Sequence, residues 1–229
     1  MKNTFKKLFI SFTVLSLTAC SSTTMQDNTF AAKENKDFTK YTNQLVVEYA
    51  ENDYTTMHQF FEHPEDYGID INNVDVSLGE FYTDNTEEIK EDQKELNKFN
   101  RSTLDKTQQT IYDELKYENE LSLKAENKKF QYLNNCWSTM SGLHQSLISV
   151  FSEYILRNEK DIQDLITLIN DVPRYTNDVL EYTKKQADKN TLQFDYDSVT
   201  QDIQDVINNK ADSSITSALY NAIDALNLD

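Results

Sequence analysis

Three histidines and two cysteines have the most versatile chemistry in this 229-residue chain, because they can bind metal ions or act as nucleophile and base. His58 and His63 lie five positions apart, which differs from the i, i+4 spacing of a helical zinc pair. Cys136 and His144 could share a helix face, but no orienting acid or oxyanion donor accompanies them. We therefore predict no catalytic residue, no metal site and no cofactor.

Cys20 is different, because it follows Leu17-Thr18-Ala19 and completes a pattern that resembles the bacterial lipobox. A basic stretch at 1–7 and an apolar run at 8–19 precede it. The run is shorter than the roughly 20 residues that cross a bilayer as a helix, and is typical of a signal-peptide core. We predict that residues 1–19 are a cleaved lipoprotein signal peptide and that the Cys20 thiol carries the lipid. An ordinary secretory signal that ends near a cysteine is the alternative.

The polar residues after Cys20 lack hydrophobic periodicity, so we predict a lipidated N-terminus and flexible tether over 20–35 and one helical domain over 36–229. A cysteine with diacylglycerol and palmitate anchors a protein stably without a membrane span. The membrane is therefore the expected partner, through the lipid on Cys20, and the expected location is the extracytoplasmic face of the bacterial cell membrane.

The charge balance excludes one class of partner. The formal net charge is -17, and removal of 1–19, with three lysines and no acid, brings it to -20. Such a surface repels the phosphate backbone, so we expect no binding to nucleic acid. After processing, Cys136 is the only free thiol, which excludes a disulfide within the chain. Its neighbour Trp137 indicates a small buried side chain more than a reactive one.

The chain has three glycines and two prolines, far fewer than a turn-rich β fold needs. Hydrophobic residues recur at helical spacing, which predicts an all-α fold, a multi-helix bundle or array. A charged segment at 80–100 is either a solvated helix or a flexible connection. The predicted helices span 38–61, 104–123, 142–156, 158–171, 195–207 and 213–226, with a further helix from 173 whose buried face includes Tyr175, Val179 and Tyr182.

The central part of the chain carries clear local signals. Asn158 followed by Asp161 indicates a capping arrangement at a helix start. Asp171 and Pro173 predict the end of that helix and the start of another, with proline at an early helical position. Between them, a buried amphipathic stripe is predicted for Ile162, Leu165, Ile166 and Ile169.

Several local patterns occur in an order that is similar to one bacterial family. They are Met57-His58 with 64–69, Ser77-Leu78-Gly79-Glu80, 109–116, Ser141-Gly142, Glu153-Tyr154, Asp161, the Pro173 to Tyr175 turn and 218–226. Their order and spacing resemble the N-terminal half of the family called domain of unknown function 885, over roughly residues 38 to 226.

The resemblance implies a relative of helical, zincin-like metallopeptidases, whose metal motif is a His-Glu pair with a downstream Pro-Gly-His in the C-terminal half. This chain ends at Asp229, before that half would begin. His63-Pro64 and His144-Gln145 do not supply an H-E-x-x-H motif, so no family catalytic residue has a counterpart here. We therefore expect a truncated, non-catalytic member of the family.

Other functions remain open at this stage. The chain is alternatively an extracellular helical module that binds a peptide or protein, or a peptidase only when it is paired with a separate C-terminal half. A complete enzyme with unrecognised chemistry is a further alternative. A half without its partner should expose an apolar face, which we predict on the helices within 199–226 and which a peptide or protein could cover.

Overall fold

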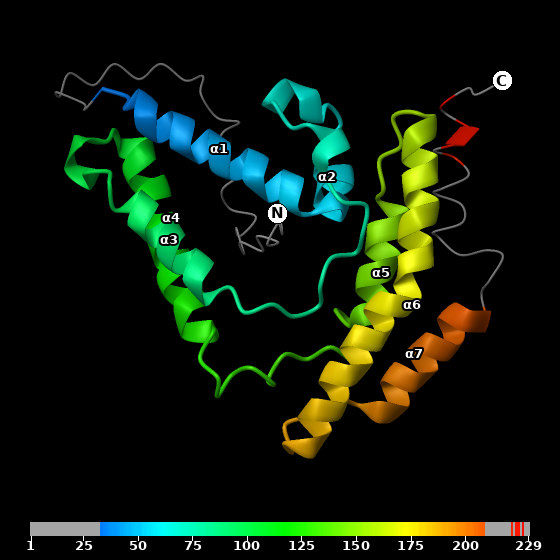
Figure 1. The fold of residues 1–229 in the computed structure, drawn as a ribbon. Helices are drawn as coiled ribbons and strands as arrows, with labels where there is room; N and C mark the ends of the chain where they lie inside the picture. The colour runs from blue at the N-terminus through cyan, green and yellow to red at the C-terminus, as the bar shows by residue number, and fades with distance from the viewer. Residues whose placement is uncertain (1–32, 209–220, 222, 225, 227–229) are drawn as a thin grey trace. The chain divides into compact units, whose positions relative to one another are not determined.

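A computed structural model describes residues 33–208, 221, 223, 224 and 226 of the chain (Figure 1). Helices dominate this part, and none of its residues lies in a β-strand, so the all-α prediction is confirmed. Three short 3-10 turns at Pro64–Tyr67, Ile71–Asn73 and Arg101–Thr103 lie in the loops. The α-helices of the described residues are α1 (Lys36–Asn52), α2 (Tyr54–Phe60), α3 (Thr86–Leu96), α4 (Lys106–Ala125), α5 (Leu143–Ser152), α6 (Glu159–Asp188) and α7 (Tyr196–Asn208).

The predicted anchor lies outside the described residues. This holds for Cys20, for the signal peptide at 1–19 and for most of the helix predicted over 213–226. These features, and the single domain predicted over 36–229, stay predictions. No helix in the described part of the chain combines the length and apolar content that crossing a bilayer requires.

The described chain divides into two compact units. The first comprises 33–52 and 84–128, and the second comprises 53–83 and 129–208 together with the described residues after 208. The first unit therefore contains α1, α3 and α4. The second contains α2, α5, α6 and α7.

An apolar core holds the first unit together. Its buried members are Phe38, Leu45, Leu96, Leu104, Tyr112 and Leu115. The rings of Phe38 and Phe99 meet edge to face with centroids 5.1 Å apart. Segment 80–100 contains the helix α3, which packs on α4 and buries Ile89 and Leu96. Each fully buried side chain of this size stabilises the unit by roughly 1.5–3 kcal/mol.

A second core, in the second unit, is rich in tyrosine. Cys136, Val179 and Tyr182 are buried there, which agrees with the prediction of a buried thiol. The indole Nε1 of Trp137 donates to the hydroxyl of Thr183 at 2.8 Å. Partly buried neighbours of this core are Phe81, Tyr132, Trp137, Leu143 and Tyr175.

The prediction of one helix over 38–61 is wrong, because the chain forms two helices there. Asp53 has extended backbone angles, φ -134° and ψ 100°, and its side chain accepts the N–H groups of Thr55 and Thr56. An aspartate in this position satisfies the free N–H groups of a new helix, so it begins α2. Periodic hydrophobic residues on both sides concealed this interruption.

The prediction of a helix boundary at Asp171 and Pro173 is also wrong, because α6 continues through Pro173. Proline inside a helix removes one backbone hydrogen bond. Side chains on both sides of it hold the adjacent loop: Asp171 Oδ2 accepts the N–H of Leu78 at 2.9 Å, and Arg174 donates to the carbonyl of Gly79 at 2.8 Å. The predicted cap at Asn158 is confirmed, since its side chain accepts the N–H of Asp161.

The buried face of α6 differs from the predicted stripe. Leu165 is buried as expected, but Ile166 and Ile169 are nearly half exposed. The buried positions of the first turns are instead Asp161, Asp164, Leu165 and Leu168. This face has the same helical spacing, but it carries two carboxylates toward the interior of the unit.

Candidate functional site

The histidines occupy three different environments. His58 is fully buried and His63 is exposed. His144 on α5 is almost buried, neither of its ring nitrogens has a hydrogen-bond partner in the described structure, and Nε2 lies 3.9 Å from a carboxylate oxygen of Asp202 on α7. Among the described residues, no three His, Cys, Asp or Glu side chains form a group that could hold a metal ion.

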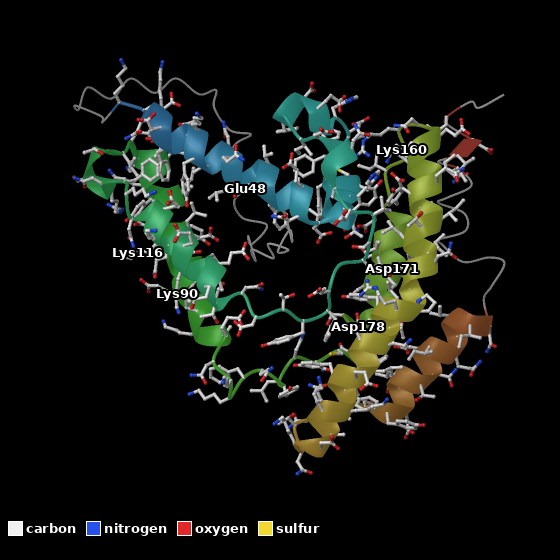
Figure 2. All side chains as sticks on the ribbon, in the orientation of Figure 1. Glu48, Lys90, Lys116, Lys160, Asp171 and Asp178 are labelled. Atoms are coloured by element: carbon white, nitrogen blue, oxygen red, sulfur yellow. The ribbon has the colours of Figure 1, made fainter. Side chains whose placement is uncertain are left out.

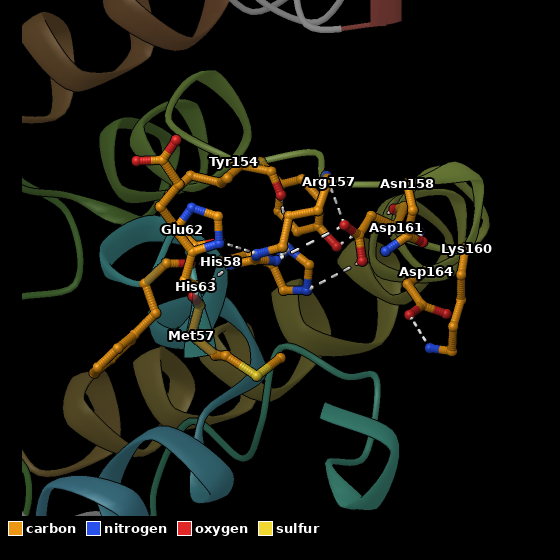
Figure 3. A network of polar contacts seen from close by, with 12 residues as sticks. Met57, His58, Glu62, His63, Tyr154, Arg157, Asn158, Lys160, Asp161 and Asp164 are labelled. Atoms are coloured by element: carbon orange, nitrogen blue, oxygen red, sulfur yellow. Dashed lines mark hydrogen bonds and ion pairs between the residues drawn. The ribbon is translucent and has the colours of Figure 1, made fainter. Parts of the chain in front are cut away.

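His58 belongs to a buried polar network where α2 meets the start of α6 (Figure 3). Its ring lies between two tyrosines. The Tyr154 ring stacks on it with centroids 4.2 Å apart and planes 2° apart, and the Tyr54 ring lies at 4.6 Å. Apolar faces on both sides leave only the edge of the imidazole for polar contacts.

Arg157 joins the end of α2 to the start of α6. Its guanidinium donates from Nε to the carbonyl of Glu62 at 2.9 Å, and from Nη2 to the carbonyl of Met57 at 3.2 Å and to that of Phe61. Its backbone N–H donates to Asp161 Oδ2 at 2.7 Å. Carbonyls at the end of a helix lack partners within it, and a cation there also favours the helix dipole.

The edge of the imidazole is only partly satisfied. Nδ1 lies 2.9 Å from the carbonyl oxygen of Ile155 and 3.0 Å from Nη1 of Arg157. A protonated Nδ1 would donate to the carbonyl, and an unprotonated Nδ1 would accept from the guanidinium. Nε2 has no hydrogen-bond partner in the described part of the chain and lies 3.9 Å from Asp161 Oδ1. Burial lowers the pKa of His58 to about 4, and the charge of Arg157 adds to this effect. The ring is therefore neutral near neutral pH.

A second carboxylate extends the network. The hydroxyl of Tyr54 donates to Asp164 Oδ2 at 2.5 Å, and Lys160 forms an ion pair with the same carboxylate. Burial, together with this hydrogen bond, raises the pKa of Tyr54 above its usual range. Each buried charge in the network thus has an opposite charge or a hydrogen-bond donor beside it, as burial demands.

The network is closed to a substrate. His58 and Asp161 have 0% and 1% of their surface exposed, and a general base must reach the proton that it removes. The hydrogen bonds and ion pairs of the network therefore hold α2 against the start of α6. The network was not predicted from the sequence, in which Asp161 indicated only a helix cap, and Asp164 on the same helix face was the available signal.

The second unit also has an open site, which we call the tyrosine pocket. It has a volume of about 410 Å³. Asp171 and Asp178 both project from α6 (Figure 2), and Asp178 lines the pocket. The pocket is lined by Glu80, Phe81, Tyr82, Gln131, Tyr132, Arg174, Asp178, Glu181, Tyr182 and Lys185.

Tyr182 is the centre of the aromatic part of this pocket. The rings of Phe81, Tyr132 and Tyr82 lie around it, with centroids 5.2, 5.4 and 6.2 Å away. The Tyr182 hydroxyl donates to the carbonyl of Gln131 at 2.7 Å, which positions the Gln131–Tyr132 backbone. Because the hydroxyl is engaged, Tyr182 contributes its ring and not a reactive group.

Several charged side chains of the pocket form ion pairs, either within the lining or with neighbours on α6. Arg174 donates from Nε to Asp171 Oδ1 at 2.6 Å and from Nη1 to Asp178 Oδ2 at 2.7 Å. Glu181 accepts from Lys184 at 2.6 Å. The Arg174 guanidinium lowers the pKa of Asp171, so this carboxylate is ionised near neutral pH.

A smaller pocket of about 230 Å³ lies next along the same segment, and we call it the amide pocket. Its wall includes Gln186, which is 2% exposed and donates to the carbonyls of Tyr132 and Asn134. The carbonyl oxygen of the Gln186 side chain has no partner within the described structure. The pocket is lined by uncharged residues: Leu133, Asn134, Asn135, Gln186, Asn190, Thr191 and Gln193. Neither pocket was predicted from the sequence, because the lining residues come from separate segments.

The model of a family described as "Bacterial protein of unknown function (DUF885)" matches residues 71–227. No curated protein and no solved structure matches the chain.

Proposed function

The chain belongs to the DUF885 family of bacterial proteins, and from this premise we propose that it is a surface lipoprotein whose helical part binds peptides. In this proposal, a lipid on Cys20 tethers the protein to the extracytoplasmic face of the membrane. Peptides bind at the tyrosine pocket of the second unit. Binding, without hydrolysis by this chain alone, is the activity.

The anchor rests on the order of three sequence features. A basic stretch at 1–7 is followed directly by an apolar run at 8–19, and this run ends in the motif Leu17-Thr18-Ala19-Cys20. Two or more acyl chains on one cysteine hold a protein at a membrane without a span.

The observation that carries peptide binding is the pairing of an aromatic pocket with an amide-lined one. Ligand sites are typically concave and aromatic, with a few polar groups that fix orientation. The two pockets are adjacent along the chain. Tyr132 and Lys185 line the tyrosine pocket, and their sequence neighbours Leu133 and Gln186 line the amide pocket. A peptide has both elements that such a surface recognises: side chains for the aromatic pocket and amides for the neighbouring one.

The lipid is tested by labelling growing cells with radioactive palmitate. We expect label on the wild-type protein and none on the Cys20→Ser variant, because only a cysteine thiol accepts the diacylglycerol. The matched Ser21→Ala variant keeps the motif and should be labelled like the wild type. A wild-type chain without label would refute the anchor.

Peptide binding is tested by fluorescence anisotropy with a mixed library of short labelled peptides, using the lipid-bearing protein in detergent micelles. Tyr82→Ala should weaken binding by roughly tenfold, because tyrosine is enriched among the interface residues whose truncation costs more than about 1 kcal/mol. Tyr117→Ala on α4 is the matched control, since Tyr117 is also an exposed tyrosine but lies in the other unit. Equal effects of the two changes would exclude the tyrosine pocket.

The same preparation tests the proposal against catalysis. Incubation of the library with the protein, followed by mass spectrometry, should leave the peptides intact. Cleavage that a metal chelator abolishes would instead show a peptidase. Cleavage that appears only with a second chain of the same cell would support the alternative of a split enzyme.

A further inference from the structure

We propose that the tyrosine pocket selects a lysine or arginine side chain, so that the protein prefers basic peptides. This inference rests on the proposed peptide binding and deepens it. It follows from the charges of the lining residues, from the faces of the aromatic rings, and from Lys189, whose ammonium lies over the Tyr132 ring.

The charges of the pocket leave an excess of carboxylates. Three lining residues, Glu80, Asp178 and Glu181, are acids, and two, Arg174 and Lys185, are basic. A negative balance at a concave site attracts a positive group, and the whole chain, with a net charge of -17, adds to this field.

Arg174 does not offer its charge to an acidic ligand. Its Nε donates to Asp171, its Nη1 to Asp178, and its Nη2 to Asp171 and to the carbonyl of Gly79. Two carboxylates therefore surround one guanidinium, and this group of three has a net charge of -1. Among the lining side chains, an acidic ligand would meet Lys185 as its main attraction, and Glu80, Asp178 and Glu181 as repulsion, which Lys184 reduces at Glu181 by pairing with it.

The aromatic rings favour a cation as well. The faces of tyrosine rings carry partial negative charge and attract ammonium and guanidinium groups within about 6 Å. The ammonium of Lys189 lies 5.0 Å from the centroid of the Tyr132 ring, so a cation of the chain itself occupies such a position. Tyr82, 43% exposed, presents a second ring to the solvent.

The test uses acetylated and amidated pentapeptides that differ only in the central residue: lysine, arginine, glutamine or glutamate. We expect the two basic peptides to bind roughly tenfold more tightly than the glutamine peptide, and the glutamate peptide to bind more weakly still. The preference should shrink as salt is raised, because exposed charges are screened.

Two charge variants should change the affinity for the lysine peptide in opposite directions. Lys185→Gln removes an exposed cation from the pocket and should tighten binding of the lysine peptide by roughly threefold. Glu181→Gln removes a carboxylate and should weaken it by a similar factor. A variant that merely damages the fold cannot tighten binding, so Lys185→Gln separates charge from stability. Glu120→Gln, in the other unit, is the control and should change nothing.

The possible outcomes distinguish the preference for basic side chains from peptide binding itself. Equal binding of all four peptides, or tighter binding of the glutamate peptide, would overturn the preference for basic side chains and leave peptide binding intact. If none of the four peptides and no member of the mixed library binds, both fail. Weaker binding of the lysine peptide to Lys185→Gln would also overturn the inference.

Discussion

The imidazole of His58 and the ring of Tyr154 lie flat against each other, with centroids 4.2 Å apart and planes 2° apart. His58 is on α2, and Tyr154 precedes α6. Their backbones also meet, since the N–H of Ile155 donates to the carbonyl of His58 at 2.8 Å. α2 is only seven residues long, so its place in the second unit depends on these contacts and on Arg157 more than on its own helical stability.

The first prediction concerns Asp161, which accepts the backbone N–H of Arg157 and lies beside its guanidinium. Asp161→Asn should lower the free energy of unfolding of the second unit by about 3 kcal/mol, because it leaves a largely buried cation without its counter-ion. Urea denaturation followed by tyrosine and tryptophan fluorescence measures this.

Asp37→Asn is the matched control, since Asp37 is an exposed acid in the first turn of α1. It should cost about 0.5 kcal/mol through the helix dipole alone. Similar losses in the two variants would show that Asp161 acts as an ordinary helix-terminal charge, and not as part of a buried network.

The second prediction concerns acid stability. Burial lowers the pKa of His58 from 6.5 to about 4, so below pH 6.5 the unfolded chain binds a proton that the folded chain does not. The stabilisation is present above pH 6.5 and is lost as pH falls toward about 4. The loss from this residue is on the order of 3 kcal/mol.

The His58→Gln variant isolates this contribution. Its stability at neutral pH should be lower, but between pH 6.5 and about 4 it should fall less steeply than that of the wild type. Urea midpoints measured across this range for both proteins give the comparison, in which His63 and His144 cancel. Parallel curves would mean that His58 titrates normally in the folded protein.

Local chemistry made part of the fold predictable. The scarcity of glycine and proline indicated helices, and Asn158 indicated a helix start because its partner lies three positions away. The His58 network was not predictable in this way. His58 and Arg157 are separated by 99 positions, and only the fold shows that an arginine faces this histidine.

The face of α6 shows a different limit. The spacing i, i+3, i+4 and i+7 is common to the predicted stripe and the observed buried face, but hydrophobicity alone favoured isoleucine at 166 and 169 over the two aspartates that are buried. Asp161 and Asp164 enter the interior because Arg157, Lys160 and Tyr54 compensate them there. The tyrosine pocket could not be predicted from the sequence either, because the segments at 80–82 and 131–132 meet α6 only in the folded unit.

The third prediction concerns Pro173, which is exposed within α6. Pro173→Ala should raise the free energy of unfolding by roughly 2 kcal/mol, because alanine restores a helical N–H and removes a steric clash at some cost in unfolded-state entropy. Thermal melting monitored by circular dichroism measures it. Lys184→Ala, at another exposed position of α6, should change stability by less than about 0.5 kcal/mol. A destabilised Pro173→Ala would indicate that the loop contacts of Asp171 and Arg174 need the proline.

The last prediction concerns the thiol of Cys136, which packs with Val179 and with Tyr182, a residue that also lines the tyrosine pocket. Burial raises its pKa from 9.0 to about 11, which lowers the thiolate fraction at mildly alkaline pH by about 100-fold. A disulfide reagent near pH 8 should therefore modify the folded lipoprotein at least about 100-fold more slowly than the urea-unfolded chain. Ser141→Cys adds an exposed thiol to the same segment and should react at once.

Because the lipid would occupy the Cys20 sulfur, Cys136 is the only thiol of the mature chain, and its slow reaction reports the opening of this core. A peptide in the tyrosine pocket contacts Tyr182, so it should slow the reaction further in proportion to its occupancy. The lysine pentapeptide should slow the modification of Cys136 in the wild type but not in the Tyr82→Ala variant. This result would show that peptide binding at the tyrosine pocket stabilises the core around Cys136. Fast modification of Cys136 in the folded protein would show instead that this core is not closed, and the pocket would then lack a fixed floor.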